Sequence, residues 1–246
     1  MLSAVVDLAR AAGAAIMVCY GDAVAVEHKA DRSPLTLADR AAHGVITDGL
    51  AALDPLTPVI SEEGSIPDFP VRKEWPRFWL VDPLDGTKEF IKRNGEFTVN
   101  ISLIEGGAPV LGVVFAPAID TAYWASRGLG AWRQRGGDAP ERIYSTACDP
   151  AGPVTIVESR SHPSAELEQY LRSFTVSRRI SIGSSLKFCS VAEGAADIYP
   201  RLGPTMEWDV AAGDCIFRNS ARTGQRPSPL TYNKPDLRNA SFVIGV

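Results

Sequence analysis

The sequence predicts an α/β protein with an α+β first lobe and an α/β second lobe. Apolar residues recur at helical spacing near the N-terminus, and apolar and polar residues alternate over 97–103 as in a strand. After residue 153, strand patterns and helix patterns follow one another in turn. A stretch rich in Gly and Pro, 135–153, separates the two regions. We therefore expect lobes of residues 1–145 and 146–246 that form a single functional unit.

The composition is that of an ordinary globular protein. The chain has 246 residues, 45% of them hydrophobic and 22% charged, so it can bury a full core and is not disordered. Its 25 Lys and Arg residues against 29 Asp and Glu leave a net charge of −4, which argues against a nucleic acid polymer as partner. The four cysteines form no C-x-x-C pair, so we expect reduced thiols, no zinc site and a cytoplasmic location.

The first helix is expected to begin near the N-terminus and to end near Gly21. Its apolar residues have helical spacing at Val5, Ala9, Ala12 and Ile16. Asp7 and Arg10 interrupt the apolar run and no basic region precedes it, so we expect an amphipathic helix rather than a signal peptide or a membrane span. Peripheral association with a membrane surface stays open.

The rest of the first lobe is predicted to hold one helix and five short strands. The helix spans 37–53, and Pro67 and Pro70 mark a loop between the first two strands. The strands are expected over 58–61, 78–82, 97–103, 109–115 and 122–126. The strand at 97–103 has the alternation of a half-buried strand, and the last three strands form an antiparallel meander.

The second lobe is predicted to alternate strands and helices. Strands are expected over 154–158, near Ile180 and over 197–199. Helices are expected over 185–193 and 209–217, and another one begins at Ser161 and Pro163. The apolar face of that helix consists of Leu167, Tyr170, Leu171 and Phe174.

Two acids, Asp82 and Asp85, follow an apolar strand and flank Pro83. The two carboxylates and the carbonyl oxygen of Leu84 form an all-oxygen set, which suits a hard cation such as Mg²⁺. The alternative is an Asp-Pro turn in which Asp85 caps a short helix. That helix would begin at Gly86, which permits a tight turn.

Three further acids lie at the ends of predicted elements. Glu62 follows a strand, and its alternative role is that of a solvated loop residue. Asp209 begins a helix and could be only a helix cap, and Asp39 could form a capping box with Thr36. One arrangement explains all of them, namely a carboxylate cluster that binds two or more divalent ions. Bound ions would reverse the local charge and attract a phosphate group.

These motifs together resemble the lithium-sensitive, magnesium-dependent phosphatases of the inositol monophosphatase superfamily. Within it, the stretch 81–115 is similar to the CysQ-type 3′(2′),5′-bisphosphate nucleotidases. The matching segments are Asp39, Ser61-Glu62-Glu63, Asp82-Pro83-Leu84-Asp85-Gly86-Thr87, Ser159-Arg160-Ser161-His162, Gly183-Ser184-Ser185-Leu186-Lys187-Phe188 and Thr205-Met206-Glu207-Trp208-Asp209. The resemblance implies a layered αβαβα sandwich.

The resemblance also implies a metal site with two or three Mg²⁺ ions. The first ion would be held by Glu62, Asp82 and the Leu84 carbonyl. The second would be held by Asp82, Asp85 and Asp209. The carboxylate chemistry agrees with this assignment, because Mg²⁺ prefers oxygen ligands.

Catalytic roles are implied for Asp39 and Thr87, which would orient and deprotonate a metal-activated water. Substrate contacts are expected from both lobes, at Glu62, Leu84, Asp85, Gly86, Thr87, Gly183, Ser184, Ser185, Lys187 and Asp209. Lys187 would lie near a phosphate, the alternative being an exposed helix lysine. His162 is either a purine or phosphate contact or a solvated loop residue. Glu207 is either a sugar contact or a surface acid.

The function that the resemblance implies is hydrolysis of the 3′-phosphate of 3′-phosphoadenosine 5′-phosphate to AMP and phosphate, with inhibition by lithium. One alternative is an inositol or sugar monophosphatase, which shares the metal motif. The other is a noncatalytic module that binds divalent ions or nucleotides. The expected partner is a small-molecule bisphosphonucleotide, and the sequence leaves open whether the chain is a monomer or a homodimer.

Overall fold

A seven-stranded sheet forms the centre of the protein in the computed structural model, which describes residues 1–21, 26–28, 34–147, 149, 151–161, 165–221 and 227–245. Its strands lie side by side in chain order, and only the first two run parallel to each other. They are β3 (Val59–Ser61), β4 (Arg77–Asp85), β5 (Thr98–Glu105), β6 (Ala108–Ala116), β7 (Thr121–Ser126), β8 (Gly130–Arg135) and β9 (Glu141–Ile143). The predicted antiparallel meander is therefore confirmed, and β8 and β9 extend it.

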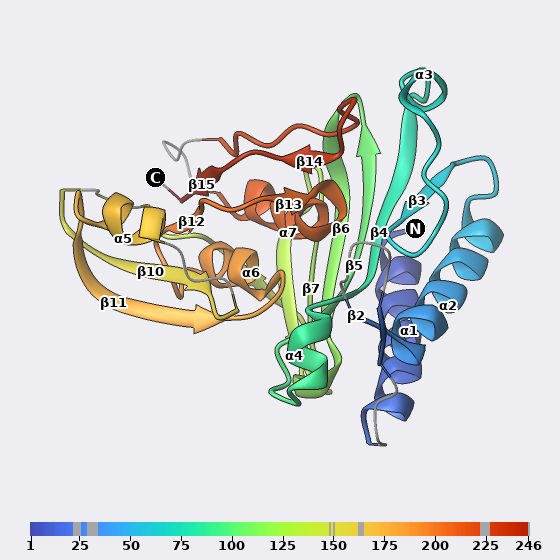
Figure 1. Cartoon of the computed structure of the whole chain (residues 1–246), viewed down its shortest axis with the longest axis horizontal. Helices are drawn as coiled ribbons and strands as arrows, with labels where there is room; N and C mark the ends of the chain where they lie inside the picture. Colours follow the sequence, from blue (N-terminus) through green and yellow to red (C-terminus); the bar gives the residue numbers. More distant parts are fainter. Residues whose placement is uncertain are drawn as a thin grey trace.

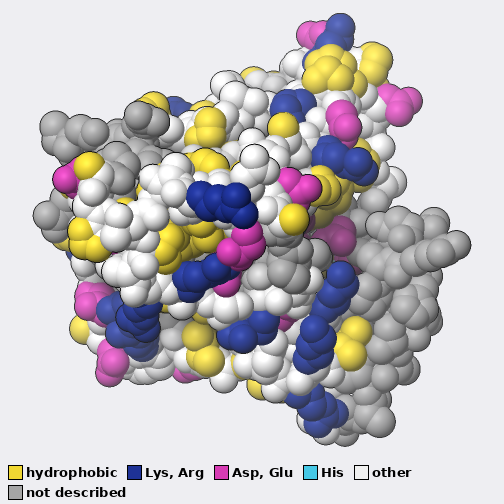
Figure 2. Space-filling model, turned by 60° about the vertical axis from the view of Figure 1, so that its left-hand side comes forward, with side chains coloured by type: hydrophobic (Ala, Val, Ile, Leu, Met, Phe, Trp, Pro, Cys, Tyr) yellow, Lys and Arg dark blue, Asp and Glu magenta, His cyan; other side chains and the backbone are white. Residues whose placement is uncertain are grey.

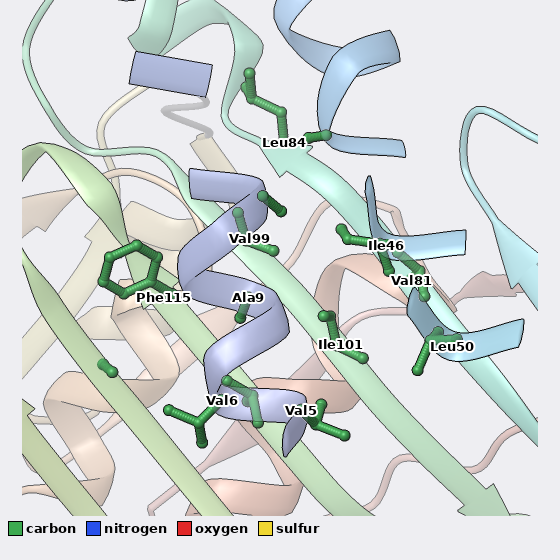
Figure 3. Close-up of a cluster of buried hydrophobic side chains, with 14 of the residues drawn as sticks. Val5, Val6, Ala9, Ile46, Leu50, Val81, Leu84, Val99, Ile101 and Phe115 are labelled. Atoms are coloured by element: carbon green, nitrogen blue, oxygen red, sulfur yellow. The ribbon is translucent and has the colours of Figure 1, made fainter. Parts of the chain in front are cut away.

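Helices α1 (Leu2–Tyr20) and α2 (Leu37–Leu53) cover one face of this sheet (Figure 1). Their apolar stripes pack on the inward side chains of β4, β5 and β6, as Figure 3 shows for residues such as Ala9, Ile46 and Ile101. Of the described helices, α1 alone is long and apolar enough to cross a bilayer. Its buried residues, among them Val5, Ala9 and Ile16, lie in this core.

The other face of the sheet is covered by α6 (Leu186–Ala192) and α7 (Glu207–Ser220) (Figure 1). Because helices lie on both faces, β5 is buried along almost its whole length, and the prediction of a half-buried strand was wrong. Its polar positions Thr98, Asn100 and Ser102 are at most 1% exposed. The alternation of polar and apolar residues in β5 therefore reflects two buried faces of different polarity and not one solvent-exposed face.

A smaller sheet lies beyond α6 and α7 and carries α5 (Ala165–Leu171) on its outer side (Figure 1). It consists of β10 (Pro153–Ser159), β11 (Thr175–Ile182), β12 (Tyr199–Arg201) and β15 (Phe242–Ile244). β10 and β11 are parallel, β12 and β15 are antiparallel, and a bridge between Ile156 and Ile198 joins the pairs. The layers are thus helix, sheet, helix, sheet, helix, which confirms the predicted αβαβα sandwich.

The remaining elements are short and mostly lie in segments expected to be loops. They are β1 (Val26–His28), β2 (Pro34–Thr36), α3 (Phe69–Arg72), α4 (Thr87–Ile91), the 3₁₀ turn η1 (Pro117–Ile119), β13 (Thr205–Met206) and β14 (Arg238–Asn239). The segment around Pro70 is thus not all loop. The predicted helix start at Pro163 lies outside the described residues, and Phe174 follows α5 instead of belonging to it.

The two predicted lobes share one hydrophobic cluster. Ile60, Phe78 and Leu80 of the large sheet pack with Phe188 of α6 and Trp208 of α7. Their joint burial is what a single functional unit requires, while the boundary between residues 145 and 146 stays a prediction.

Candidate metal and phosphate site

The end of β4 shapes the floor of the site. The ladder between β4 and β5 is interrupted between Asp82 and Asp85, so the chain bulges at Pro83 and Leu84. The Leu84 N–H donates to Asp82 Oδ1 at 3.1 Å, which holds that carboxylate against the turn. Gly86 has a φ of +90°, a left-handed conformation that favours glycine, and α4 begins at the next residue.

Three carboxylates from different elements meet above this turn. Glu62 follows β3, whose parallel pairing with β4 brings the carboxyl ends of both strands together. Asp209 lies in the first turn of α7, where its Oδ2 accepts a hydrogen bond from the Met206 N–H at 2.9 Å. One ligand oxygen from each of Glu62, Asp82 and Asp209 lies within 4.8 Å of the others. Asp209 thus serves the helix start and the cluster at once.

The cluster is strongly electronegative. Burial raises the pKa of Asp82 well above its usual value, and the charges of Glu62, Asp85, Asp209 and Asp39 raise it further. Burial and the charge of Asp85 likewise raise the pKa of Asp209. A divalent cation would relieve this repulsion, and a donor set made only of oxygens fits a hard ion. The residues present therefore fit the metal that the sequence predicts.

Asp85 lies beside the three-carboxylate group without belonging to it. Its charge acts on both Asp82 and Asp209, so it lies near the two carboxylates with which it was predicted to share an ion. Ser184, from the segment before α6, donates to Asp85 Oδ2 at 2.8 Å. The second lobe thus contributes directly to the orientation of this carboxylate.

Thr87 and Asp39 approach each other as the sequence predicts. The Thr87 hydroxyl lies 3.4 Å from Asp39 Oδ1 and 3.4 Å from the Leu84 carbonyl oxygen, so both hydrogen bonds are long. Asp39 is 2% exposed and lies in the first turn of α2. The side chain of Thr36, its alternative partner in a capping box, lies outside the described residues.

One pocket collects most of the predicted site residues from both sides of the predicted lobe boundary. From the first lobe it is lined by Glu62, Asp82, Leu84, Asp85, Gly86 and Thr87, and from the second by Gly183, Ser184, Ser185, Lys187 and Asp209. Asp39 is not part of the lining and lies behind Thr87.

Lys and Arg side chains gather in several groups on the face of the molecule seen in Figure 2, with acidic side chains between some of them.

Lys187 is buried, with 7% of its surface exposed, so the alternative of an exposed helix lysine was wrong. Its Nζ donates to the Ser184 carbonyl oxygen and lies 5.7 Å from the centre of the Tyr199 ring. Burial lowers the pKa of Lys187 to about 8. Burial of the charged Lys187 side chain costs desolvation free energy, and an anionic ligand in the pocket would offset that cost.

Arg201 is a pocket residue that the sequence reasoning missed. It belongs to β12 and lines the pocket with Tyr199. Within the part of the chain that the structure describes, its buried Nε has no hydrogen-bond partner. No motif surrounds Arg201, so only the packing of β12 beside α6 reveals it. Lys88 also lines the pocket, and its position next to Thr87 was a visible signal.

Glu207 has neither of its two predicted roles. It is fully buried and accepts hydrogen bonds from Lys234 Nζ at 2.6 Å and from the Asn233 N–H at 2.7 Å. It therefore anchors the C-terminal segment to the start of α7 and is neither a sugar contact nor a surface acid. His162 lies outside the described residues.

The five-layered fold, with carboxylates of two strand ends and one helix start gathered in one pocket, defines a class of α/β proteins with an acidic site that could hold metal ions. A profile of the inositol monophosphatase family matches residues 1–223, and the chain belongs to this family. Members of the family are metal-dependent, in agreement with the acidic cluster. The resemblance inferred from the motifs is thus confirmed.

Among its relatives, the chain is similar to the 3′(2′),5′-bisphosphate nucleotidase CysQ of Escherichia coli O157:H7. The two are 54% identical over 254 aligned residues, with 100% of both chains covered. Among solved structures, CysQ from Bacteroides thetaiotaomicron is 41% identical with a TM-score of 0.83, covering 100% of this chain and 96% of the other. SuhB of Mycobacterium tuberculosis is 26% identical with a TM-score of 0.77, covering 99% and 90%.

Proposed function

We propose that this chain is a Mg²⁺-dependent phosphatase that hydrolyses the 3′-phosphate of 3′-phosphoadenosine 5′-phosphate, releasing AMP and inorganic phosphate. The observation that carries the proposal is the full-length identity of 54% to a 3′(2′),5′-bisphosphate nucleotidase. The pocket agrees with it, because carboxylates line the same cavity as the buried Lys187 and the half-buried Arg201. Water supplies the oxygen that replaces the ester oxygen on phosphorus.

Two groups of oxygen donors would hold Mg²⁺. The first consists of Glu62, Asp82 and the Leu84 carbonyl, and the second of Asp82, Asp85 and Asp209. Two observations support a shared Asp82: it is 2% exposed, and all the other acids raise its pKa. Bound divalent ions supply positive charge that attracts the phosphate and stabilises the charge that develops on its oxygens.

Thr87 and Asp39 would handle the proton of the attacking water. The Thr87 hydroxyl can accept a hydrogen bond from water while it donates its own proton to Asp39 Oδ1, 3.4 Å away. Asp39 is buried behind Thr87, so its carboxylate can receive a proton without facing the phosphate. α4 begins at Thr87, directly after Gly86, and backbone N–H groups at a helix start suit phosphate oxygens.

The second phosphate of the substrate would meet Lys187 and Arg201. The charge of Arg201 contributes to lowering the pKa of Lys187, so the two side chains are close enough to repel each other electrostatically. Two neighbouring cations on one wall are balanced by an anion better than by a neutral sugar. This wall supports a bisphosphate over inositol phosphate, whose single phosphate would occupy the carboxylate end.

A phosphate-release panel tests the proposed function. Purified protein with Mg²⁺ or with EDTA is assayed on 3′-phosphoadenosine 5′-phosphate, its 5′-phosphosulfate analogue, inositol 1-phosphate and fructose 1,6-bisphosphate. We expect the bisphosphonucleotide to be preferred by about tenfold or more, AMP as product by chromatography, no turnover with EDTA and inhibition by millimolar lithium. A preference for inositol phosphate would instead support the monophosphatase alternative, and no turnover of any ester would support the binding module.

We further propose that the enzyme acts in the cytoplasm on this small molecule. What supports this is the cysteine pattern of the sequence, which has no C-x-x-C pair. Of the described cysteines, Cys19, Cys189 and Cys215 are free, and Cys148 lies outside the described residues. Light scattering after gel filtration distinguishes the monomer from the homodimer.

A further inference from the structure

Two polar side chains of β5, Thr98 and Asn100, are buried beside the site without lining its pocket. Thr98 is 0% and Asn100 1% exposed. Burying a hydroxyl or an amide costs free energy unless hydrogen bonds replace those to water. The partners of these two side chains therefore indicate why β5 carries them.

The register of the sheet places both residues next to predicted metal ligands. Across the β4–β5 ladder, Asn100 pairs with Asp82 and Thr98 pairs with Asp85, on either side of the bulge. The Thr98 hydroxyl donates to Asn100 Oδ1 at 2.9 Å. This bond turns the amide so that Nδ2, the donor end, points away from Thr98.

The amide nitrogen of Asn100 then reaches both halves of the site. Nδ2 donates to Ser185 Oγ at 3.0 Å and lies 3.4 Å from Asp85 Oδ2. The Ser185 hydroxyl in turn donates to the Asp209 carbonyl oxygen at 2.7 Å. Asn100 is thus linked to Asp85 directly and to the first turn of α7 through one serine.

Asp85 Oδ2 receives donors from two sides. Besides Asn100, the Ser184 hydroxyl donates to the same oxygen at 2.8 Å. Donors gathered at Oδ2 fix the plane of the carboxylate and leave Oδ1 as the oxygen to offer to a cation. Partners of this kind orient metal ligands in other proteins.

We propose that Thr98 and Asn100 are positioning residues for the divalent cation held by Asp85 and Asp209. They fix the carboxylate of Asp85 and its distance from the start of α7, so that ligands from both lobes are prepared before the ion binds. The proposal rests on the metal assignment of the proposed function, but not on the identity of the substrate.

Ser102, two residues further along β5, provides the matched comparison. It is also 0% exposed, but its hydroxyl donates to the Leu111 carbonyl oxygen at 2.8 Å, inside the sheet. Ser102→Ala therefore removes a buried hydroxyl from the same strand without touching the site. Thr98→Val removes the Thr98 hydroxyl at nearly constant side-chain volume. Thr98→Ser keeps the hydroxyl and removes only the methyl group.

The experiment measures cation binding in two ways on the full-length protein. The first readout is the rise in unfolding temperature when Mg²⁺ alone is added to metal-free protein, and the second is the Mg²⁺ concentration for half-maximal hydrolysis. We expect Thr98→Val and Asn100→Ala to raise that concentration by about 10-fold to 100-fold, the range seen when partners of metal ligands are removed. Both variants should also show a smaller thermal rise than Ser102→Ala, while Thr98→Ser behaves like the wild type.

The possible results separate this proposal from the proposed activity. Equal Mg²⁺ responses for Thr98→Val, Asn100→Ala and Ser102→Ala would overturn the positioning role. If Asn100→Ala does not fold, the comparison of Thr98→Val with Thr98→Ser decides. A wild-type protein that gains no thermal stability from Mg²⁺ would overturn the metal assignment and the positioning role together. A wild type that responds to Mg²⁺ but does not hydrolyse the bisphosphonucleotide would refute the substrate alone.

Discussion

Asp82 and Asp85 differ by three positions in sequence but have different surroundings. Asp82 is buried among acids that raise its pKa, whereas Asp85 receives hydrogen bonds from Ser184 and Asn100. The bulge after Asp82 makes this difference, because it lets both side chains reach the same pocket from one strand end. Residue type alone therefore does not set the role of each acid.

Asp85→Asn tests the metal assignment at a single ligand. Replacing the carboxylate by a neutral amide of equal size removes one predicted ligand, so kcat/KM for phosphate release should fall by about 100-fold or more. The unfolding temperature without Mg²⁺ should not fall, because the charge of Asp85 opposes the ionisation of Asp82 and Asp209. Asp7→Asn, on the exposed side of α1, is the control. Near-wild-type turnover of Asp85→Asn would contradict the metal assignment.

The pKa of Lys187, about 8, means that the side chain is charged below and neutral above that pH. The KM for the bisphosphonucleotide should therefore rise severalfold between about pH 7 and pH 9, as the attraction to phosphate is lost. Lys187→Arg keeps its charge over this range, so its KM should change much less. Parallel profiles for both proteins would show that Lys187 does not bind the phosphate.

At the scale of elements, the position of α7 decides whether Asp209 reaches the cluster. The helix packs closely on β6 at Gly112, where an added Cβ would lie 2.6 Å from Cys215 Cβ and 2.7 Å from the Ala212 carbonyl oxygen. Because the second of these atoms belongs to the helix backbone, no rotamer change can make room. The glycine thus sets the distance between the sheet and the helix that carries Asp209.

We therefore predict that Gly112→Ala destabilises the protein by about 1–3 kcal/mol through overpacking. For a chain of this size, that lowers the unfolding temperature by about 2–4 °C per kcal/mol. The Mg²⁺ requirement should rise as well, because α7 must move and Asp209 moves with it. Gly44→Ala in α2, where nothing lies within 4 Å of the added Cβ, should be neutral or slightly stabilising. Thermal unfolding of both variants checks this, and equal stabilities would contradict the packing argument.

At the scale of the whole molecule, the acidic pocket links folding to pH and metal. The raised pKa values of Asp82 and Asp209 mean that, at a given pH above their usual 3.8, the folded state holds protons that the unfolded state releases. Rising pH therefore favours the unfolded state of the metal-free protein. Cations compensate for the charges and remove this cost.

Metal-free protein should thus lose stability as the pH rises from about 4 towards neutrality, whereas saturating Mg²⁺ should flatten this dependence. Urea unfolding at a series of pH values, with EDTA or with Mg²⁺, measures it. In EDTA, the unfolding free energy of Asp82→Asn should depend less steeply on pH, because one of the two carboxyls with a raised pKa is gone. Identical slopes with and without Mg²⁺ would argue against ion binding in this pocket.

The strongly periodic elements were predictable from sequence. α1 and α2 follow their apolar stripes closely, since each buries one face against a single sheet. β8 and β9 were not predicted, because the Gly and Pro residues around them resemble a linker. They become strands only because β8 pairs with β7 and β9 pairs with β8. The burial of β5 was misjudged because a helix from the second lobe covers its other face, and no local pattern shows that.

From the sequence alone, carboxylates at strand ends and helix starts could be singled out as candidate ligands for a hard cation, each with an alternative role in a turn, loop or cap. The sequence also determined the family, because several motifs agree along the chain. The fold was needed to see that Glu62, Asp82 and Asp209 lie within 4.8 Å of one another. It was also needed to see that the buried Glu207 accepts hydrogen bonds from the C-terminal segment, that Arg201 lines the pocket and that Asn100 bonds to Ser185. The physical reason is that proximity across two lobes depends on sheet register and helix packing, which distant segments settle jointly.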